Sequence, residues 1–175
     1  TVTDANTSAA PAVVTLENHR LALRVTKVDA DTRQMLSGAV FSQIDERGEV
    51  VRVAPVYGEV DTCEVTSNGG ETFTIPQSGS ITVLGVPIGA YTLREVSAPA
   101  GYAKNEVDAR VVIGNEHTVN APVQTVVENH ALAVQVAKTD GLTGERLPGV
   151  RFRVESLTGI ALRVKNVAEG KYRVD

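Results

Sequence analysis

The sequence predicts an all-β protein, a sandwich of short strands that is repeated in tandem along the chain. Apolar and polar residues alternate with the period of two that half-buried strands show, and no segment holds a helical period. Glycines punctuate the middle of the chain at about the spacing of sandwich turns. The chain also repeats itself, because Asn18 returns as Asn129 and Lys27 as Lys138, each at an offset of 111 residues (129 − 18 and 138 − 27). A repeat this long indicates tandem domains rather than a solenoid of small units.

The repeat divides the 175 residues into three parts. Residues 20–130 form one complete unit, residues 1–19 hold the last strand of a preceding unit with its linker, and residues 131–175 form the N-terminal part of a following unit. About 110 residues suffice for a small core. Because aromatic residues are scarce, we expect that core to consist of Val, Leu, Ile and Ala. Both ends fall inside repeat units, so we expect a piece of a longer protein. That no signal peptide opens the chain then says nothing about location.

Each element of the complete unit is predicted from alternation and from turn residues. Leu21, Leu23 and Val25 alternate with polar or small residues and predict the first strand. A middle section follows, with turns at Gly48, Gly58, Gly69-Gly70 and Gly79. Next come two strands on either side of a turn at Gly85–Gly89, the first with Ile81 and Val83 and the second with Tyr91 and Leu93. Two last strands are predicted over Glu106–Ile113 and Val123–Asn129.

The flanking units are incomplete, so their strands lack partners. Val13–Asn18 aligns with the last strand of a unit whose sheet is missing. Leu157–Asp175 is interpreted as an early hairpin of a unit that lacks half its sheet.

Composition excludes several function classes. The formal net charge is −4, and no Lys/Arg cluster accompanies aromatic residues, so the footprint of a nucleic-acid-binding protein is absent. No apolar stretch reaches transmembrane length, and no spacing typical of metal ligands occurs, so we expect neither a metal nor a cofactor. Cys63 is the only cysteine, which rules out an intrachain disulfide. Its neighbours Thr62, Glu64 and Thr66 indicate an exposed strand or loop and an unreactive thiol.

Three polar residues of the complete unit have the strand phase of core residues. Lys27, Glu95 and Asn129 each share the parity of the apolar residues in their own strand, and parity fixes the face to which a side chain points. Taken singly, a lysine at a strand end usually reaches water, an asparagine there is usually a turn residue, and an edge glutamate is usually solvated. Because all three match in phase, and Lys and Asn recur in the adjoining units, we favour an inward direction.

This combination of residue types predicts a chemical reaction. Burial disfavours the charged forms of lysine and glutamate, and so favours a free amine and a protonated acid. The amine of Lys27 is then a nucleophile, the Asn129 carboxamide is an acyl donor, and Glu95 can polarise the carbonyl and shuttle protons. The result would be an intramolecular transamidation that releases ammonia and leaves an isopeptide bond.

Three runs of residues carry a resemblance to a known family. Leu36–Phe41 (LSGAVF) and Gly85–Tyr91 (GVPIGAY) resemble the B-type repeat domains of Gram-positive surface proteins. Tyr91–Tyr102 is similar, without a mismatch, to the pilin E-box Y-x-L-x-E-x-x-A-P-x-G-Y. These are the prealbumin-like, collagen-adhesin B-type modules of sortase-assembled pilins and adhesin stalks. The resemblance covers residues 20–130 fully and both flanks partly.

The resemblance implies an inverse immunoglobulin-like (prealbumin-like) β-sandwich with a self-generated Lys–Asn or Lys–Asp bond between its first and last strands. By position, Lys27, Asn129 and Glu95 correspond to the nucleophile, the acyl donor and the catalytic acid of crosslink formation. Asn18 and Lys138 correspond to the acyl donor and the nucleophile of the incomplete neighbouring repeats, and we expect both to stay uncrosslinked.

The resemblance also implies an extracellular, cell-wall-attached protein. Its partners would be other pilin or adhesin domains of the same chain, and any host-surface ligand would bind through other regions. No nucleic acid and no membrane insertion of this fragment are expected. The Y-P-K pilin motif and the L-P-x-T-G sorting signal do not occur in the sequence, so a shaft subunit, a tip adhesin and a wall-anchored stalk all stay open.

The leading functional hypothesis is a structural stalk or pilin module stiffened by the isopeptide bond. The alternative is a ligand-binding adhesive module that uses loops in residues 50–80, the stretch most variable in pattern. An enzyme acting on external substrates lacks support, since no Ser, Cys or His has a recognisable catalytic partner.

Overall fold

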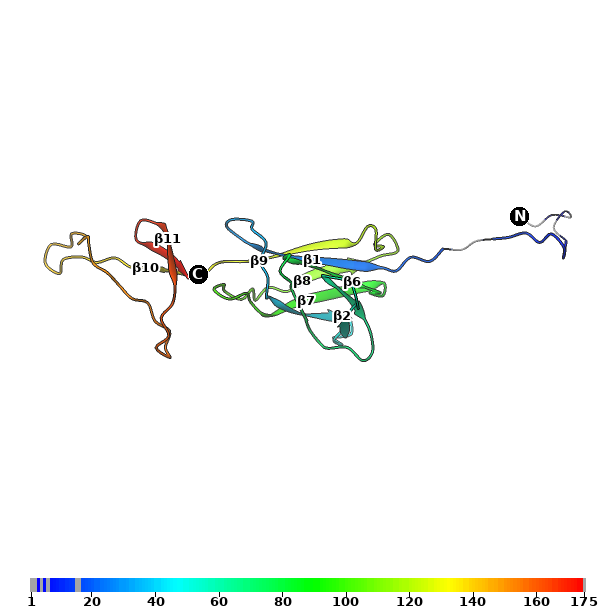
Figure 1. Ribbon diagram of the computed structural model, residues 1–175, viewed down its shortest axis with the longest axis horizontal. Coiled ribbons are helices and arrows are strands. Elements are labelled where there is room, and N and C mark those ends of the chain that lie inside the picture. Colours follow the sequence, from blue (N-terminus) through cyan, green and yellow to red (C-terminus); the bar gives the residue numbers. More distant parts are fainter. Residues whose placement is uncertain (1–2, 4, 6, 15–16, 175) are drawn as a thin grey trace.

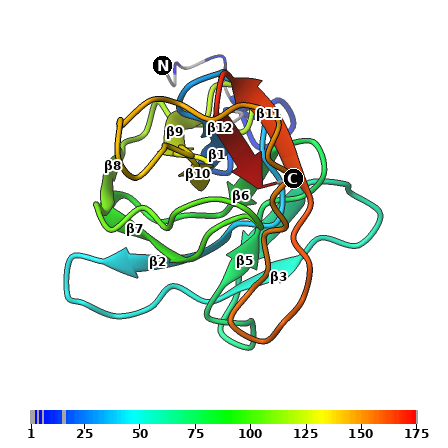
Figure 2. The ribbon, with the colours of Figure 1, turned by 90° about the vertical axis from the view of Figure 1, so that its left-hand side faces the viewer.

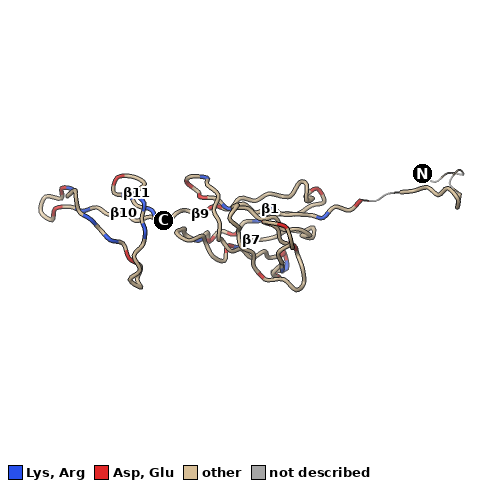
Figure 3. Tube along the Cα trace, in the orientation of Figure 1, with Lys and Arg blue, Asp and Glu red and all other residues tan. Residues whose placement is uncertain are grey.

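The computed structural model describes residues 3, 5, 7–14 and 17–174, and all of their regular structure is β-strand. Over these residues the fold offers no helix of the length and apolarity that a membrane span requires. The strands between residues 22 and 129 form two sheets, and the later strands form a separate small sheet (Figure 1). Charges of both signs are distributed over these parts (Figure 3). The prediction of an all-β sandwich is confirmed.

The first sheet places the first and last strands of the sandwich side by side. Its strand order is β3-β4-β6-β1-β9, with bounds Val53–Pro55 (β3), Thr62–Val65 (β4), Ser80–Leu84 (β6), Ala22–Asp29 (β1) and Val123–Asn129 (β9). β1 pairs antiparallel with β6 and parallel with β9. The parallel register sets Lys27 opposite Val127 and Asp29 opposite Asn129. Lys27 and Asn129 are therefore diagonal neighbours on adjacent strands.

The second sheet carries Glu95 on its longest strand. Its order is β5-β2-β7-β8, with bounds Phe73–Thr74 (β5), Val40–Asp45 (β2), Gly89–Ser97 (β7) and Ala109–Ile113 (β8). β7 pairs antiparallel with both β2 and β8. The predicted turn at Gly85–Gly89 leads from β6 in one sheet to β7 in the other, so it crosses the sandwich instead of closing a hairpin. Gly85 has a φ of +70°, a conformation that favours glycine there.

The core lies between the two sheets, which Figure 2 shows end-on. It is mostly aliphatic, as composition predicted, and its most deeply buried members include Leu23, Val25, Phe41, Ile75, Val83, Val86, Leu93 and Ile113. Cys63 on β4 belongs to this core with an exposed fraction of 4%. The prediction of an exposed position for Cys63 is therefore wrong: the alternation along β4 leaves its neighbours Thr62 and Glu64 half-buried and directs the thiol inward.

A third, small sheet follows the sandwich, and the turn after its first strand repeats the turn that follows β1. Its order is β10-β12-β11, with bounds Ala133–Gln135 (β10), Lys171–Val174 (β12) and Val164–Ala168 (β11). After β1, the Asp29 carboxylate accepts hydrogen bonds from the backbone N–H groups two and three residues later, at 2.9 Å each. Asp140, at the repeat offset, does the same at 2.8 and 2.9 Å. The sequence repeat thus extends to backbone conformation.

The preceding unit contributes no strand within the described residues. Residues 13–14 and 17–18 are exposed and belong to no strand, and residues 15–16 of the expected Val13–Asn18 strand lie outside the described part of the chain.

Candidate functional site

Lys27, Glu95 and Asn129 lie together inside the sandwich. Their exposed fractions are 0%, 3% and 2%, so all three side chains are buried. Lys27 comes from β1, Asn129 is the last residue of β9, and Glu95 reaches them from β7 in the opposite sheet. Each strand alternates between core-facing and outward residues, and these three occupy core-facing positions. Strand phase thus predicted their inward direction correctly.

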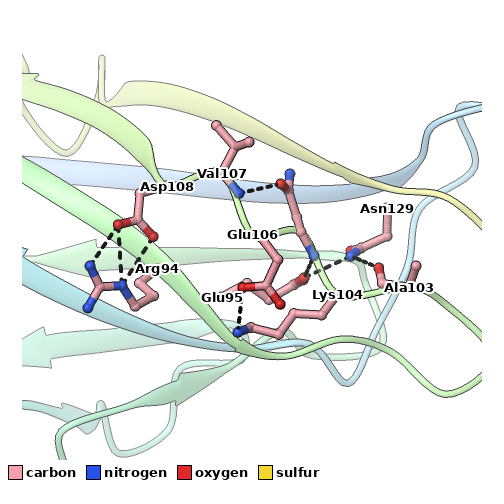
Figure 4. A network of polar contacts seen from close by, with 9 residues as sticks. Arg94, Glu95, Ala103, Lys104, Glu106, Val107, Asp108 and Asn129 are labelled. Carbon is pink, nitrogen blue, oxygen red and sulfur yellow. Dashed lines mark hydrogen bonds and ion pairs between the residues drawn. The ribbon is translucent and has the colours of Figure 1, made fainter.

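Glu95 lies between the amine and the carboxamide. Its Oε1 is 3.3 Å from Lys27 Nζ, and its Oε2 accepts a hydrogen bond of 2.7 Å from Asn129 Nδ2. Asn129 Nδ2 also donates to the carbonyl oxygen of Ala103 at 2.6 Å. Figure 4 shows Asn129 between Glu95 and Ala103. One carboxyl oxygen therefore faces the Lys27 amine, and the other faces the nitrogen that a transamidation would release.

The environment of Lys27 lowers the pKa of its amine. Burial lowers the pKa of Lys27, and the negative charge of the adjacent Glu95 offsets part of this effect. The ring of Phe41, whose centroid is 5.9 Å from Nζ, provides only a weak cation–π contact. Only the free amine has the lone pair that a nucleophile needs, so a lowered pKa suits Lys27 to attack a carbonyl carbon.

Three buried atoms of this cluster lack a hydrogen-bond partner among the described residues. They are Lys27 Nζ, Glu95 Oε1 and Asn129 Oδ1. Nζ and Oε1 are in contact but are not aligned for a hydrogen bond. An unsatisfied buried polar atom costs about 1–3 kcal/mol, and such atoms are rare in native proteins. The sequence predicts that Glu95 polarises the Asn129 carbonyl, whereas the atom it contacts is the amide nitrogen.

The segment Ala103–Asn105, which sequence analysis did not identify, also contacts the cluster. The backbone N–H of Asn105 donates to Glu95 Oε2 at 2.6 Å, and its side-chain Nδ2 donates to the carbonyl oxygen of Glu128 at 3.2 Å. Most of these contacts use backbone groups, which every residue type has, so composition and spacing could not reveal them. The one available signal was the position of the segment directly after the E-box.

Asp29 is a second buried carboxyl group near the cluster, but its oxygens are already occupied. Oδ1 accepts the two turn N–H groups, while Oδ2 accepts from the Tyr102 hydroxyl at 2.9 Å and lies 3.1 Å from Arg173 Nη1. Burial alone would raise the pKa of Asp29, but hydrogen bonds from the turn amides and from Tyr102 outweigh it and lower the pKa to about 2. Asp29 is therefore held ionised, and Glu95 is the carboxyl group placed to exchange protons with the amine.

The equivalent residues of the neighbouring repeats do not join this cluster. Asn18 and Lys138 are both exposed. No group of three or more His, Cys, Asp or Glu side chains within the described ranges is arranged to hold a metal ion.

Residues 50–80, the predicted ligand-binding region, consist of short strands of the two sheets joined by longer turns and loops. They contain β3, β4, β5 and the first residue of β6. A cavity of about 310 Å³ lies beside residues 50–52 and 65–67. No contact in this region points to a ligand class, so the binding hypothesis gains no specific observation.

Residues 22–126 match the SpaA family, a prealbumin-like fold domain. Among solved structures, the chain is similar to GBS52, the minor pilin of Streptococcus agalactiae, with 22% identity and a TM-score of 0.54 over 70% of this chain and 49% of that one. It is also similar to the pilus 2b backbone protein of group B streptococcus, with 27% identity and a TM-score of 0.50 over 67% and 43%. The shaft pilin SpaA of Lactobacillus rhamnosus GG is similar as well, with 17% identity and a TM-score of 0.53 over 69% of this chain and 50% of that one. No curated protein sequence matches the chain.

The chain spans half or less of the length of these three pilins. The family match runs from the first residue of β1 into β9 and includes Lys27 and Glu95. It confirms the resemblance to prealbumin-like B-type repeats that the E-box indicated. The chain thus belongs to the SpaA family of prealbumin-like fold domains.

Proposed function

We propose that residues 20–130 are a structural module of a pilus or surface adhesin, stiffened by an isopeptide bond that forms spontaneously between Lys27 and Asn129. The observation that carries the proposal is the set of unpartnered buried atoms on Lys27, Glu95 and Asn129. Nζ becomes the new amide nitrogen, Oδ1 belongs to the attacked carbonyl, and Oε1 faces the attacking nitrogen. Nζ and Oε1 meet as an ion pair 3.3 Å apart, but neither they nor Oδ1 accept or donate a hydrogen bond among the described residues. A purely structural polar network would hydrogen-bond all three.

The contacts of Glu95 define a route for the proton. Lys27 Nζ attacks Asn129 Cγ, and the bond between Cγ and Nδ2 breaks. One of the two hydrogens of the amine stays on the new amide, and Glu95 carries the other from Nζ, 3.3 Å from Oε1, to Nδ2, 2.7 Å from Oε2. Nδ2 leaves as ammonia, and Glu95 ends in the state in which it began. The chain catalyses this single crosslinking event on itself and needs no external substrate.

The structural role draws support from the solved pilins that share the fold. A shaft, backbone or minor pilin works outside the cell, which supports an extracellular position, attached to the cell wall. The partners of the module would be neighbouring domains of the same chain and further pilin or adhesin subunits. The three units, 1–19, 20–130 and 131–175, are then parts of a tandem stalk.

The proposal is tested by the intact mass of the full chain under denaturing conditions. Loss of ammonia lowers the mass by about 17 Da, and we expect this deficit in the parent chain. Lys27→Met and Glu95→Gln keep the side-chain size but remove the amine or the acid, so both variants should have their full mass. Lys138→Met, which removes the repeat-equivalent lysine, is the matched control and should retain the deficit. Full mass in the parent chain would refute the crosslink.

The same spectra test the neighbouring repeats. Asn18 and Lys138 lack the other members of their clusters, so a single deficit is expected. A parent chain that lost about 34 Da, two molecules of ammonia, would show that one of them also reacts.

A further inference from the structure

We propose that Ala103–Asn105 is a positioning element of the crosslinking reaction, and that Asn105 is its positioning residue. The backbone of this segment would fix the orientation of the Asn129 carboxamide and of the Glu95 carboxyl group. The Asn105 side chain would hold the segment against β9. This inference rests on the proposed function, and it adds residues outside the Lys–Glu–Asn cluster.

The Ala103 carbonyl decides which way the Asn129 carboxamide points. A carbonyl oxygen can only accept hydrogen bonds, so the group that lies 2.6 Å from it must be the amide nitrogen. Turning the carboxamide over would place Oδ1 against the carbonyl oxygen and lose this bond. Ala103 thereby keeps Nδ2, the leaving nitrogen, next to Glu95 Oε2.

The Asn105 N–H fixes the carboxyl group in the same way. It donates to Glu95 Oε2 at 2.6 Å, so this oxygen accepts from both Asn105 and Asn129. With Oε2 held by two donors, Oε1 is left to face Lys27 Nζ. Reactions of this kind depend steeply on geometry, and a misplacement of about 1 Å can cost about 100-fold in rate.

The segment is fastened to β9 on both sides of Asn129. Asn105 Nδ2 donates to the Glu128 carbonyl at 3.2 Å, and the Ala103 N–H donates to the His130 carbonyl at 2.9 Å. The segment also lines a cavity of about 360 Å³ that reaches Asn129. This space is ample for ammonia, which is about the size of a water molecule. The positioning element thus leaves the departing nitrogen a way out.

The test compares the rate of crosslinking in Asn105 variants of the full chain. Asn105→Ala removes both side-chain hydrogen bonds, whereas Asn105→Asp keeps the oxygen that accepts from the Val107 N–H at 2.9 Å and loses only the Nδ2 donor. Lys104→Ala is the control within the same segment, because the proposal uses the backbone of residues 103–105 and the Asn105 side chain, whereas the Lys104 side chain pairs with Glu106. Chains are made by cell-free synthesis, stopped at intervals in denaturant, and analysed for the fraction that has lost ammonia.

We expect both Asn105 variants to react about 10- to 100-fold more slowly than the parent chain and to reach the same final mass. Lys104→Ala should stay within about twofold of the parent rate, since it alters no contact of the reacting groups. The same substitutions in a Lys27→Met chain, which has no nucleophile, report stability alone. There the Asn105 variants should be fully folded under the reaction conditions, so that slower crosslinking cannot reflect unfolding.

Crosslinking at the parent rate in both Asn105 variants would overturn the proposal. Crosslinking at the parent rate in Asn105→Asp but not in Asn105→Ala would overturn it too, because the Nδ2 donor would then not be needed. A loss of folding that accounts for the slower rate would also overturn it. If the parent chain never loses ammonia, the crosslink itself is refuted. Reaction of the parent chain together with unchanged rates in the variants refutes only the positioning role.

Discussion

Removing the nucleophile should convert an inextensible module into an extensible one. β1 and β9 are adjacent and parallel, and Lys27 and Asn129 both lie near the C-terminal ends of these strands. Tension that enters before β1 and leaves after β9 would cross from one strand to the other through a Lys27–Asn129 bond. The chain from residue 28 to residue 128 would then carry no load, so force could not unfold it by extension.

The size of the effect follows from the length of the bypassed chain. An extended residue spans about 3.3–3.6 Å, so the roughly 100 residues between Lys27 and Asn129 would release about 330–360 Å on unfolding. Lys27→Met should therefore give a stepwise gain in contour length of this size. The parent chain and the Lys138→Met control should give none from this unit.

The assay is single-molecule force–extension of the full chain, held by handles at its two ends. Steps of about 330–360 Å in the parent chain would refute the load path, even if the mass deficit were present. Absence of the step in Lys27→Met would refute it as well, because the bond would then not be what prevents extension. Glu95→Gln, which keeps the amine but lacks the proton carrier, should behave like Lys27→Met.

Three further predictions concern stability and reactivity. Gln43 is 1% exposed, and its Nε2 and Oε1 have no hydrogen-bond partner among the described residues. Gln43→Met should therefore raise the free energy of unfolding by about 1–3 kcal/mol, measured by denaturant titration in a Lys27→Met chain. No gain would mean that Gln43 is hydrogen-bonded in solution. Burial raises the pKa of the Cys63 thiol to about 12, so iodoacetamide should leave the native chain unmodified at neutral pH and label it only after unfolding, and rapid native labelling would contradict this. The pKa of Asp29 is about 2 in the fold against an ordinary 3.8, so its ionised form stabilises the fold above pH 4, and this contribution is lost as the pH falls from about 4 to 2. In a Lys27→Met chain, Asp29→Asn should therefore flatten the decline in the free energy of unfolding over that pH range. An unchanged slope would refute the lowered pKa of Asp29.

The buried cluster could be predicted from sequence because strand parity is a local property. Lys27, Glu95 and Asn129 each follow an apolar alternation in their own strand, so the inward direction needed no knowledge of the partners. Their proximity needed more, namely the parallel pairing of β1 with β9 and the packing of β7 across the core. Alternation does not encode which strands pair, and here the E-box resemblance supplied that step.

What escaped prediction depends on contacts between segments. The Gly85–Gly89 turn has the same composition whether it closes a hairpin or crosses between sheets, and only the packed sheets decide between these. The polar neighbours of Cys63 suggested an exposed position, although its alternation with them also allows an inward side chain. The pairing of β4 with β6 places Cys63 in the sheet with its thiol in the core. The roles of Ala103 and Asn105 rest mainly on backbone hydrogen bonds, which leave no trace in residue type.

Burial would couple the proposed reaction to folding. In an unfolded chain, the amine of Lys27 is hydrated and charged, and it would become a nucleophile only when the two sheets pack and water is lost. The folded, unreacted cluster then contains an amine, a carboxyl group and a carbonyl with unpartnered atoms, which makes this part of the core less stable than an apolar one of the same shape. Converting the amine to a neutral amide would remove a group that is costly to bury. The instability of the cluster would therefore favour the proposed crosslinked state, and it would arise only in chains that have already reached the correct fold.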